Sequence, residues 1–104
     1  MFSFIETKLF TRLVQEHLTD DEYQKLQLLL IERPKAGNAV PGTGGVRKLR
    51  WRAPGRGKRG GYRVIYYAKI DPGVIWMLTI YPKNVKENIP VNVLRDIRKE
   101  IENE

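Results

Sequence analysis

The chain has 104 residues, 41% of them hydrophobic, which suits a single domain over residues 1–104 with its own core and argues against a disordered tail. No apolar run approaches the length of a membrane span, and the N-terminus lacks the basic start of a signal peptide, so a cytoplasmic protein is expected. The sequence contains no cysteine, which excludes disulfides, thiolate metal sites and cysteine nucleophiles.

The net charge of +7 is concentrated in the middle of the chain. Residues 34–69 contain ten Lys or Arg and no Asp or Glu, whereas acids outnumber bases on both sides of this segment. A block of like charge without counter-charges repels itself, so folding alone does not favour it. We therefore expect it to bind a polyanion, of which nucleic acid is the commonest. The alternative is a solvated surface that only keeps the protein soluble.

The first third of the chain predicts a short strand and two helices. Residues 2–6, FSFIE, alternate between apolar and polar side chains as a strand does, and helical spacing of apolar residues follows from Thr7 to about His17. Thr19 and Glu22 then form a capping box that begins a second helix. The residue before a proline avoids helical geometry, so this helix is expected to end at Pro34.

The rest of the chain predicts a loop, three strands and a last helix. The loop is expected at 35–45 from its Gly and Pro content, and an apolar stripe after Pro82 predicts the helix. Three segments are rich in β-forming residues: 46–52, 61–69 and 74–81. The order β-α-α-β-β-β-α indicates a small α+β domain, with an antiparallel-rich sheet and helices packed on one side.

The segment GRGKRG, from Gly55 to Gly60, matches the dinucleotide-binding pattern G-x-G-x-x-G. That motif works only where a helix follows it, because the pyrophosphate sits on the helix N-terminus. Here a predicted strand follows. We interpret the segment as the flexible loop of a β-hairpin, with three cations at its tip: Arg56, Lys58 and Arg59.

The chain offers little to a metal ion or to serine catalysis. His17 is the only histidine and has no cysteine partner, and Ser3 is the only serine. We therefore expect no metal site and no cofactor.

The predicted strands place several cations on one sheet face. Lys48 and Arg50 are two residues apart and so share a face of their strand, and Arg63 comes alongside them if the two strands form a hairpin. Lys83 follows the next strand, at the mouth of a possible cleft. Four converging cations suit a phosphodiester; the alternative is a row of edge charges that block aggregation. Further nucleic-acid contacts are expected from Arg47, Arg52, Arg56, Lys58 and Arg59.

RNA can be cleaved without a metal if its 2′-OH attacks the adjacent phosphate. This reaction needs a base for the hydroxyl, an acid for the 5′-oxygen and cations for the negative charge of the transition state. Crowded lysines can supply the first two, because neighbouring positive charges lower the pKa of a lysine. Arginine stays charged and binds phosphate oxygens through its planar fork, so it suits charge stabilisation.

Three segments, together with the order of elements, resemble the RelE/HigB superfamily of type II toxin–antitoxin toxins, and most closely its HigB-type branch: GTGGVRKLRW (42–51), GKRGGYRVIYY (57–67) and TIYPKN (79–84). The resemblance implies a RelE-like fold and a metal-independent endoribonuclease. Such a toxin enters the A site of the 70S ribosome, cuts mRNA there by 2′-OH attack and inhibits translation. It also implies a cognate antitoxin, often one with a helix-turn-helix DNA-binding domain.

By position, Lys48 and Arg50 match the family's basic pair, and Arg63 matches the arginine that supports the phosphate. Lys83 falls in the basic turn after the last strand, although the family's arginine aligns nearer Asn84. The histidines that some members use are absent, and the C-terminal tyrosine of others falls on a proline. The resemblance therefore leaves four candidates for proton transfer: Lys48, Lys83, Tyr66 and Tyr81.

Two other functions stay open at this point. The same basic surface could serve a non-catalytic module that binds RNA or the ribosome, or a toxin of the same fold that inhibits another target such as gyrase. A DNA-binding protein is less favoured, because no predicted helix carries the basic residues of a recognition helix.

Overall fold

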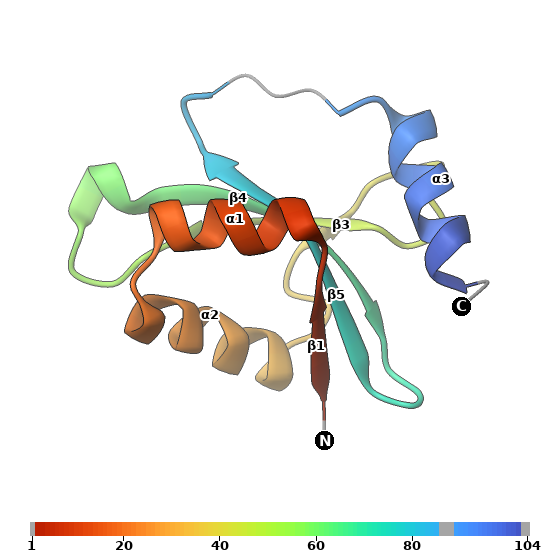
Figure 1. The fold of residues 1–104 in the computed structure, drawn as a ribbon, viewed down its shortest axis with the longest axis horizontal. Coiled ribbons are helices and arrows are strands. Elements are labelled where there is room, and N and C mark those ends of the chain that lie inside the picture. Colours follow the sequence, from red (N-terminus) through yellow and green to blue (C-terminus); the bar gives the residue numbers. More distant parts are fainter. Residues whose placement is uncertain (1, 86–88, 103–104) are drawn as a thin grey trace.

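The computed structural model describes residues 2–85 and 89–102, without the side chains of Lys58, Arg59 and Glu102. The elements follow the predicted order, with a two-residue strand added inside the loop expected at 35–45 and a 3-10 helix inside the expected hairpin loop (Figure 1). They are β1 (Ser3–Glu6), α1 (Lys8–His17), α2 (Asp20–Glu32), β2 (Asn38–Ala39), β3 (Arg47–Arg52), the 3-10 helix η1 (Gly57–Gly60), β4 (Gly61–Lys69), β5 (Val74–Pro82) and α3 (Val91–Glu102).

The strands form one mixed sheet in the order β1-β5-β4-β3-β2. β1 runs parallel to β5, and the other neighbouring strands are antiparallel, so the predicted antiparallel-rich α+β fold is confirmed. No tight turn joins β1 to β5, and two helices and three strands separate them in the chain, so a parallel pairing is accessible to them. β4 and β5 lie at the centre and are buried along most of their length.

Helices α1 and α2 cover one face of the sheet and lie next to each other across it (Figure 1). Thr7 caps α1, since its hydroxyl accepts a hydrogen bond from the N–H of Phe10. The predicted capping box of Thr19 and Glu22 begins α2. The two helices bury Phe10, Val14, Leu26 and Leu30 against apolar side chains of β3, β4 and β5.

Helix α3 packs against the opposite face of the sheet, well apart from α1 and α2 in Figure 1. The expectation that helices pack on one side therefore holds for α1 and α2 and not for α3. Strands β4 and β5 carry apolar side chains on both faces, so both faces need cover. Leu94 of α3 supplies it by joining a buried cluster with Val46, Ile65, Leu78 and Tyr81.

The GTGG segment of residues 42–45 is the loop on which α3 rests. Gly44 has a φ of +78°, a backbone conformation that favours glycine, and its carbonyl accepts a 3.1 Å hydrogen bond from Nε of Arg98. The Arg98 guanidinium also lies 5.8 Å from the ring centre of Tyr67. No helix in the described ranges is long and apolar enough to cross a membrane.

Candidate active site

Strand β3 turns its exposed cations to the face of the sheet that also carries α3. Leu49 and Trp51 are buried in the cluster under α1 and α2, so strand alternation directs the residues between them the other way. Arg63 of β4 pairs with Arg50 and therefore shares this orientation. We call this surface the basic face, defined by Lys48, Arg50, Arg52 and Arg63.

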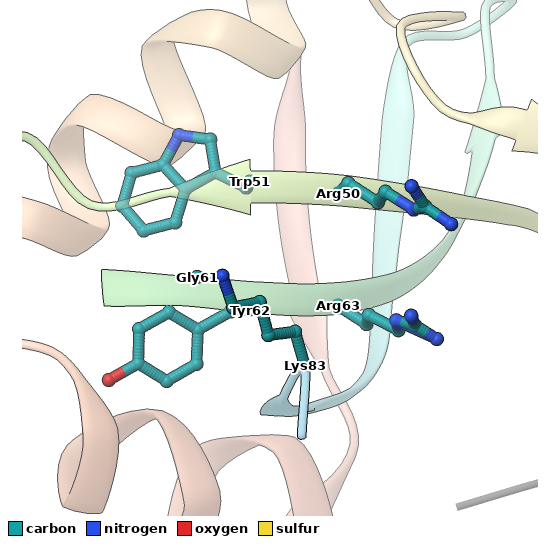
Figure 2. A pocket seen from close by; sticks show the side chains of 6 residues that line it. All are labelled: Arg50, Trp51, Gly61, Tyr62, Arg63 and Lys83. Atoms are coloured by element: carbon teal, nitrogen blue, oxygen red, sulfur yellow. The ribbon is translucent and has the colours of Figure 1, made fainter. Parts of the chain in front are cut away.

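Arg50 and Arg63 lie directly opposite each other across β3 and β4, and Arg63 in turn lies opposite Tyr81 of β5. Figure 2 shows the two guanidinium groups side by side, projecting in the same direction. Nε of Arg63 is buried and has no hydrogen-bond partner among the described residues. Like charges directly opposite in a sheet destabilise it, so this arrangement favours the binding of an anion.

A hollow of about 150 Å³ lies beside this pair, and Lys83 completes it. Lys83 follows directly after β5, and its backbone N–H donates a 3.1 Å hydrogen bond to the carbonyl of Gly61. The hollow is lined by Arg50, Trp51, Gly61, Tyr62, Arg63 and Lys83. Neither ion pair found among the described residues includes a cation of this hollow. Three cations without a carboxylate partner among the described residues make this hollow a candidate site for a phosphate group.

Lys48 and Tyr81 lie beside the Arg50–Arg63 pair, on its α3 side. In the sheet, Lys48 is opposite Ile65, one row from the Arg50–Arg63 pair. Together with Tyr81, Ile65 and Leu94 it lines a second, smaller cavity of about 40 Å³ between the sheet and α3. Lys48 and Tyr81 thus adjoin the arginine pair without lining the larger hollow.

Two predicted nucleic-acid contacts have other partners. Arg47 has the same parity on β3 as the buried Leu49, and its Nη1 donates a 2.7 Å hydrogen bond to the carbonyl of Gly37. Arg56 forms an ion pair with Glu22 and donates a 2.7 Å hydrogen bond to the hydroxyl of Tyr62. Neither arginine lies on the basic face.

The other three predicted nucleic-acid contacts are Arg52, Lys58 and Arg59. Arg52 is exposed, and it lies on the basic face opposite Gly61, next to the hollow. The side chains of Lys58 and Arg59 lie outside the described part of the chain.

The electrostatic surroundings of Glu22 explain its tie to Arg56. Burial alone would raise the pKa of Glu22, but hydrogen bonds from the backbone N–H of Thr19 and from Arg56 outweigh burial and hold it below its ordinary value. The carboxylate therefore stays charged next to the guanidinium, as a charge-assisted hydrogen bond requires.

The proton-transfer candidate Tyr66 is in the cluster under α1 and α2. Its hydroxyl donates a 2.8 Å hydrogen bond to the carbonyl of Pro34 and accepts a 2.9 Å bond from the N–H of Gly37. Burial raises the pKa of Tyr66. The structure thus separates Tyr66 from the arginine pair and leaves Lys48, Lys83 and Tyr81 near it.

Sequence reasoning missed three residues that line the hollow: Trp51, Gly61 and Tyr62. Trp51 and Tyr62 are cross-strand partners with buried rings, so their pattern predicts packing. Gly61 could have been noticed in the sequence, because it begins a strand, where the extended backbone does not require glycine. Within the described residues, no group of three His, Asp or Glu is placed to hold a metal ion.

Comparison with protein families identifies this small α+β protein as a toxin of a toxin–antitoxin system. The chain belongs to the RelE family: the family described as the RelE toxin of the RelE/RelB toxin–antitoxin system matches residues 3–102. Membership in this family implies a cognate antitoxin.

A solved structure supports the same fold. The chain is similar to a mutant of the Escherichia coli toxin RelE in the free state, with 18% sequence identity and a TM-score of 0.55. The alignment covers 93% of this chain and 96% of the other. The family match over residues 3–102 confirms, at the level of the RelE family, the resemblance inferred from the sequence.

Proposed function

We propose that this toxin is a ribonuclease that cuts mRNA on the ribosome by 2′-OH attack, without a metal ion, and so stops translation. The observation that carries the proposal is the Arg50–Arg63 pair, two guanidinium groups held opposite each other on one sheet face with no carboxylate partner among the described residues. A phosphodiester in the adjoining hollow would compensate their repulsion.

The chemistry follows from the charge that develops at phosphorus. The 2′-oxygen forms a bond to phosphorus while the bond from phosphorus to the 5′-oxygen breaks, which leaves a 2′,3′-cyclic phosphate and a 5′-hydroxyl. One proton leaves the 2′-OH and another joins the departing oxygen. The transition state has more negative charge than the substrate, and fixed guanidinium groups stabilise it more strongly than they stabilise the substrate.

Proton transfer belongs to the remaining groups of this surface. Lys83 lines the same hollow as the two arginines and is therefore closest to a bound phosphate. Lys48 and Tyr81 share the adjoining cavity, on the α3 side of the arginine pair. We assign proton transfer to Lys83 together with Lys48 or Tyr81.

The partners follow from charge and family. Arg52 extends the basic face beyond the hollow, where it would contact the phosphate backbone of messenger or ribosomal RNA without reading sequence. Such a protein acts in the cytoplasm, where translating ribosomes are. The antitoxin that the family implies would neutralise it, and we propose that this antitoxin carries a helix-turn-helix DNA-binding domain.

The proposal is tested with purified protein and ribosomes programmed with a defined mRNA. Primer extension should show one or a few cuts, and an mRNA with a 2′-deoxynucleotide at the cut position should stay intact. Arg63→Ala should abolish the cuts while the protein still binds ribosomes.

Two outcomes would replace the proposal. Binding to ribosomes without any cut would assign the basic face to a non-catalytic RNA-binding module. Inhibition of DNA supercoiling, with the mRNA left intact, would instead assign the protein to a gyrase-directed toxin of the same fold.

A further inference from the structure

The space above Gly61 is filled by another residue's side chain. Gly61 begins β4 with φ −84° and ψ 127°, an extended conformation that any residue adopts, so its backbone does not require glycine. A Cβ added here would lie 2.8 Å from Cδ and 3.2 Å from Cε of Lys83. Figure 2 shows the stem of Lys83 running along β4 toward Gly61.

We propose that Gly61 is a positioning residue for Lys83: its missing side chain leaves the surface of β4 open, and the lysine stem lies on it. The inference rests on the proposed ribonuclease function. The hydrogen bond from the N–H of Lys83 to the carbonyl of Gly61 holds the two backbones together, so the stem starts beside this opening. With the opening filled, the stem would have to leave the sheet surface.

The direction of the stem matters because Lys83 lines the hollow next to Arg50 and Arg63. A free lysine side chain samples many rotamers and extends into water. Figure 2 places the Lys83 ammonium beside Gly61, at the end of the hollow away from the guanidinium tips of Arg50 and Arg63, so a stem that lies on β4 keeps the ammonium at that end of the hollow. Displacing a reacting group by about 1 Å can slow an enzyme about 100-fold, so this placement bears on rate.

Gly60, the glycine before Gly61, has a different role in the structure. A Cβ at Gly60 would lie 2.5 Å from Cβ of Arg56 and 3.1 Å from the carbonyl oxygen of Ala53. Gly60 therefore allows the hairpin loop to close on itself. The three atoms nearest to a Cβ at Gly61 all belong to the exposed, flexible side chain of Lys83, so Gly61→Ala should leave the fold intact.

The test compares Gly61→Ala, Lys83→Ala and the double variant in single-turnover cleavage on programmed ribosomes. We expect Gly61→Ala to slow cleavage at least 10-fold, toward the rate of Lys83→Ala, with ribosome affinity and melting temperature close to wild type. In the Lys83→Ala background, Gly61→Ala should cause no further loss, because the displaced stem is already absent. The two single variants should also change the pH–rate profile in the same way.

Two results would overturn the inference while leaving the proposed function intact. One is wild-type cleavage by Gly61→Ala or Lys83→Ala in an assay where Arg63→Ala is inactive. The other is losses from Gly61→Ala and Lys83→Ala that multiply in the double variant. Absence of cleavage by the wild-type protein would contradict the proposed function instead. The inference would then be judged by acetic anhydride labelling, which should modify Lys83 faster in Gly61→Ala than in wild type; equal labelling would overturn it.

Discussion

The guanidinium of Arg56 lies 2.5 Å from the carboxylate of Glu22, which joins the hairpin loop between β3 and β4 to the first turn of α2. Oε1 of Glu22 accepts this bond together with the backbone N–H of Thr19, so the helix cap and the loop share one carboxylate. The glycine-rich loop is therefore anchored at one side and not free along its length.

The shared carboxylate predicts a pH-dependent stability. Replacing Glu22 by Gln should lower the free energy of unfolding by about 1.5 to 3 kcal/mol at pH 7, the usual range for a hydrogen bond to a charged group. The fold holds the pKa of Glu22 below its unfolded value, so the contribution is complete above about pH 4.3 and disappears as the pH falls through the folded-state pKa. Urea unfolding of both proteins from pH 7 to pH 3 measures the difference.

The control for this prediction is a double-mutant cycle with Arg56→Met. The coupling between Glu22→Gln and Arg56→Met should be present at pH 7 and should shrink as the pH falls toward the folded-state pKa of Glu22. Zero coupling between the two substitutions at pH 7 would show that the ion pair does not stabilise the fold.

The arginine pair predicts opposite effects on activity and stability. Arg63→Gln removes one of two like charges that lie opposite each other, so the melting temperature should stay the same or rise. Cleavage should fall about 100- to 1,000-fold, the usual loss when one group that stabilises transition-state charge is removed. Arg50→Gln should behave alike. A loss of activity that follows a loss of melting temperature would point to a structural role.

Arg52, at the exposed end of β3, is expected to affect the salt dependence of ribosome binding and not the rate of cleavage. Arg52→Gln should weaken ribosome binding and lower the slope of log K against log salt concentration by about 1, with the cleavage rate of bound mRNA unchanged. Lys25→Gln is the matched control, because Lys25 pairs with Asp21 on α2, under the other face of the sheet. Equal slopes for the two variants would remove Arg52 from the binding surface.

Substitutions of Tyr66 and Tyr81 are expected to affect different properties, stability for Tyr66 and cleavage rate for Tyr81. Tyr66→Phe leaves the buried N–H of Gly37 without its acceptor and should cost about 1 to 3 kcal/mol of stability, with the cleavage rate of the folded protein unchanged. Tyr81→Phe, next to Arg63, should lower the rate with a smaller effect on stability if Tyr81 transfers a proton. Thermal melts and single-turnover rates at one pH distinguish the two variants. A slower rate for Tyr66→Phe and a lower stability for Tyr81→Phe would contradict both assignments.

Local patterns were enough to predict most of the elements. The capping box at Thr19 needs only residues within one helical turn, and the orientation of Arg50 follows from strand alternation around two buried neighbours. The placement of Arg47 was also available from that alternation, since it has the parity of Leu49. Charge alone had grouped it with the exposed cations.

Other features depend on contacts between distant parts of the chain. The partner of Arg56 is 34 residues away, and no local pattern distinguishes an anchored arginine from a free one. An amphipathic stripe predicts that α3 buries one side, but both faces of the sheet were apolar enough to receive it. The role of Gly61 could be inferred only from the position of Lys83, which lies next to Gly61 because β5 pairs with β4.

The parallel pairing of β1 with β5 has a consequence for how the toxin is made. β1 ends at Glu6, yet its partner β5 begins only at Val74, and Lys83 follows β5. Long-range strand pairing has to wait until both strands exist. During translation the nascent chain therefore lacks both the strand that pairs with β1 and the third cation of the hollow until Lys83 has been added. A product that ends before Lys83 lacks this cation.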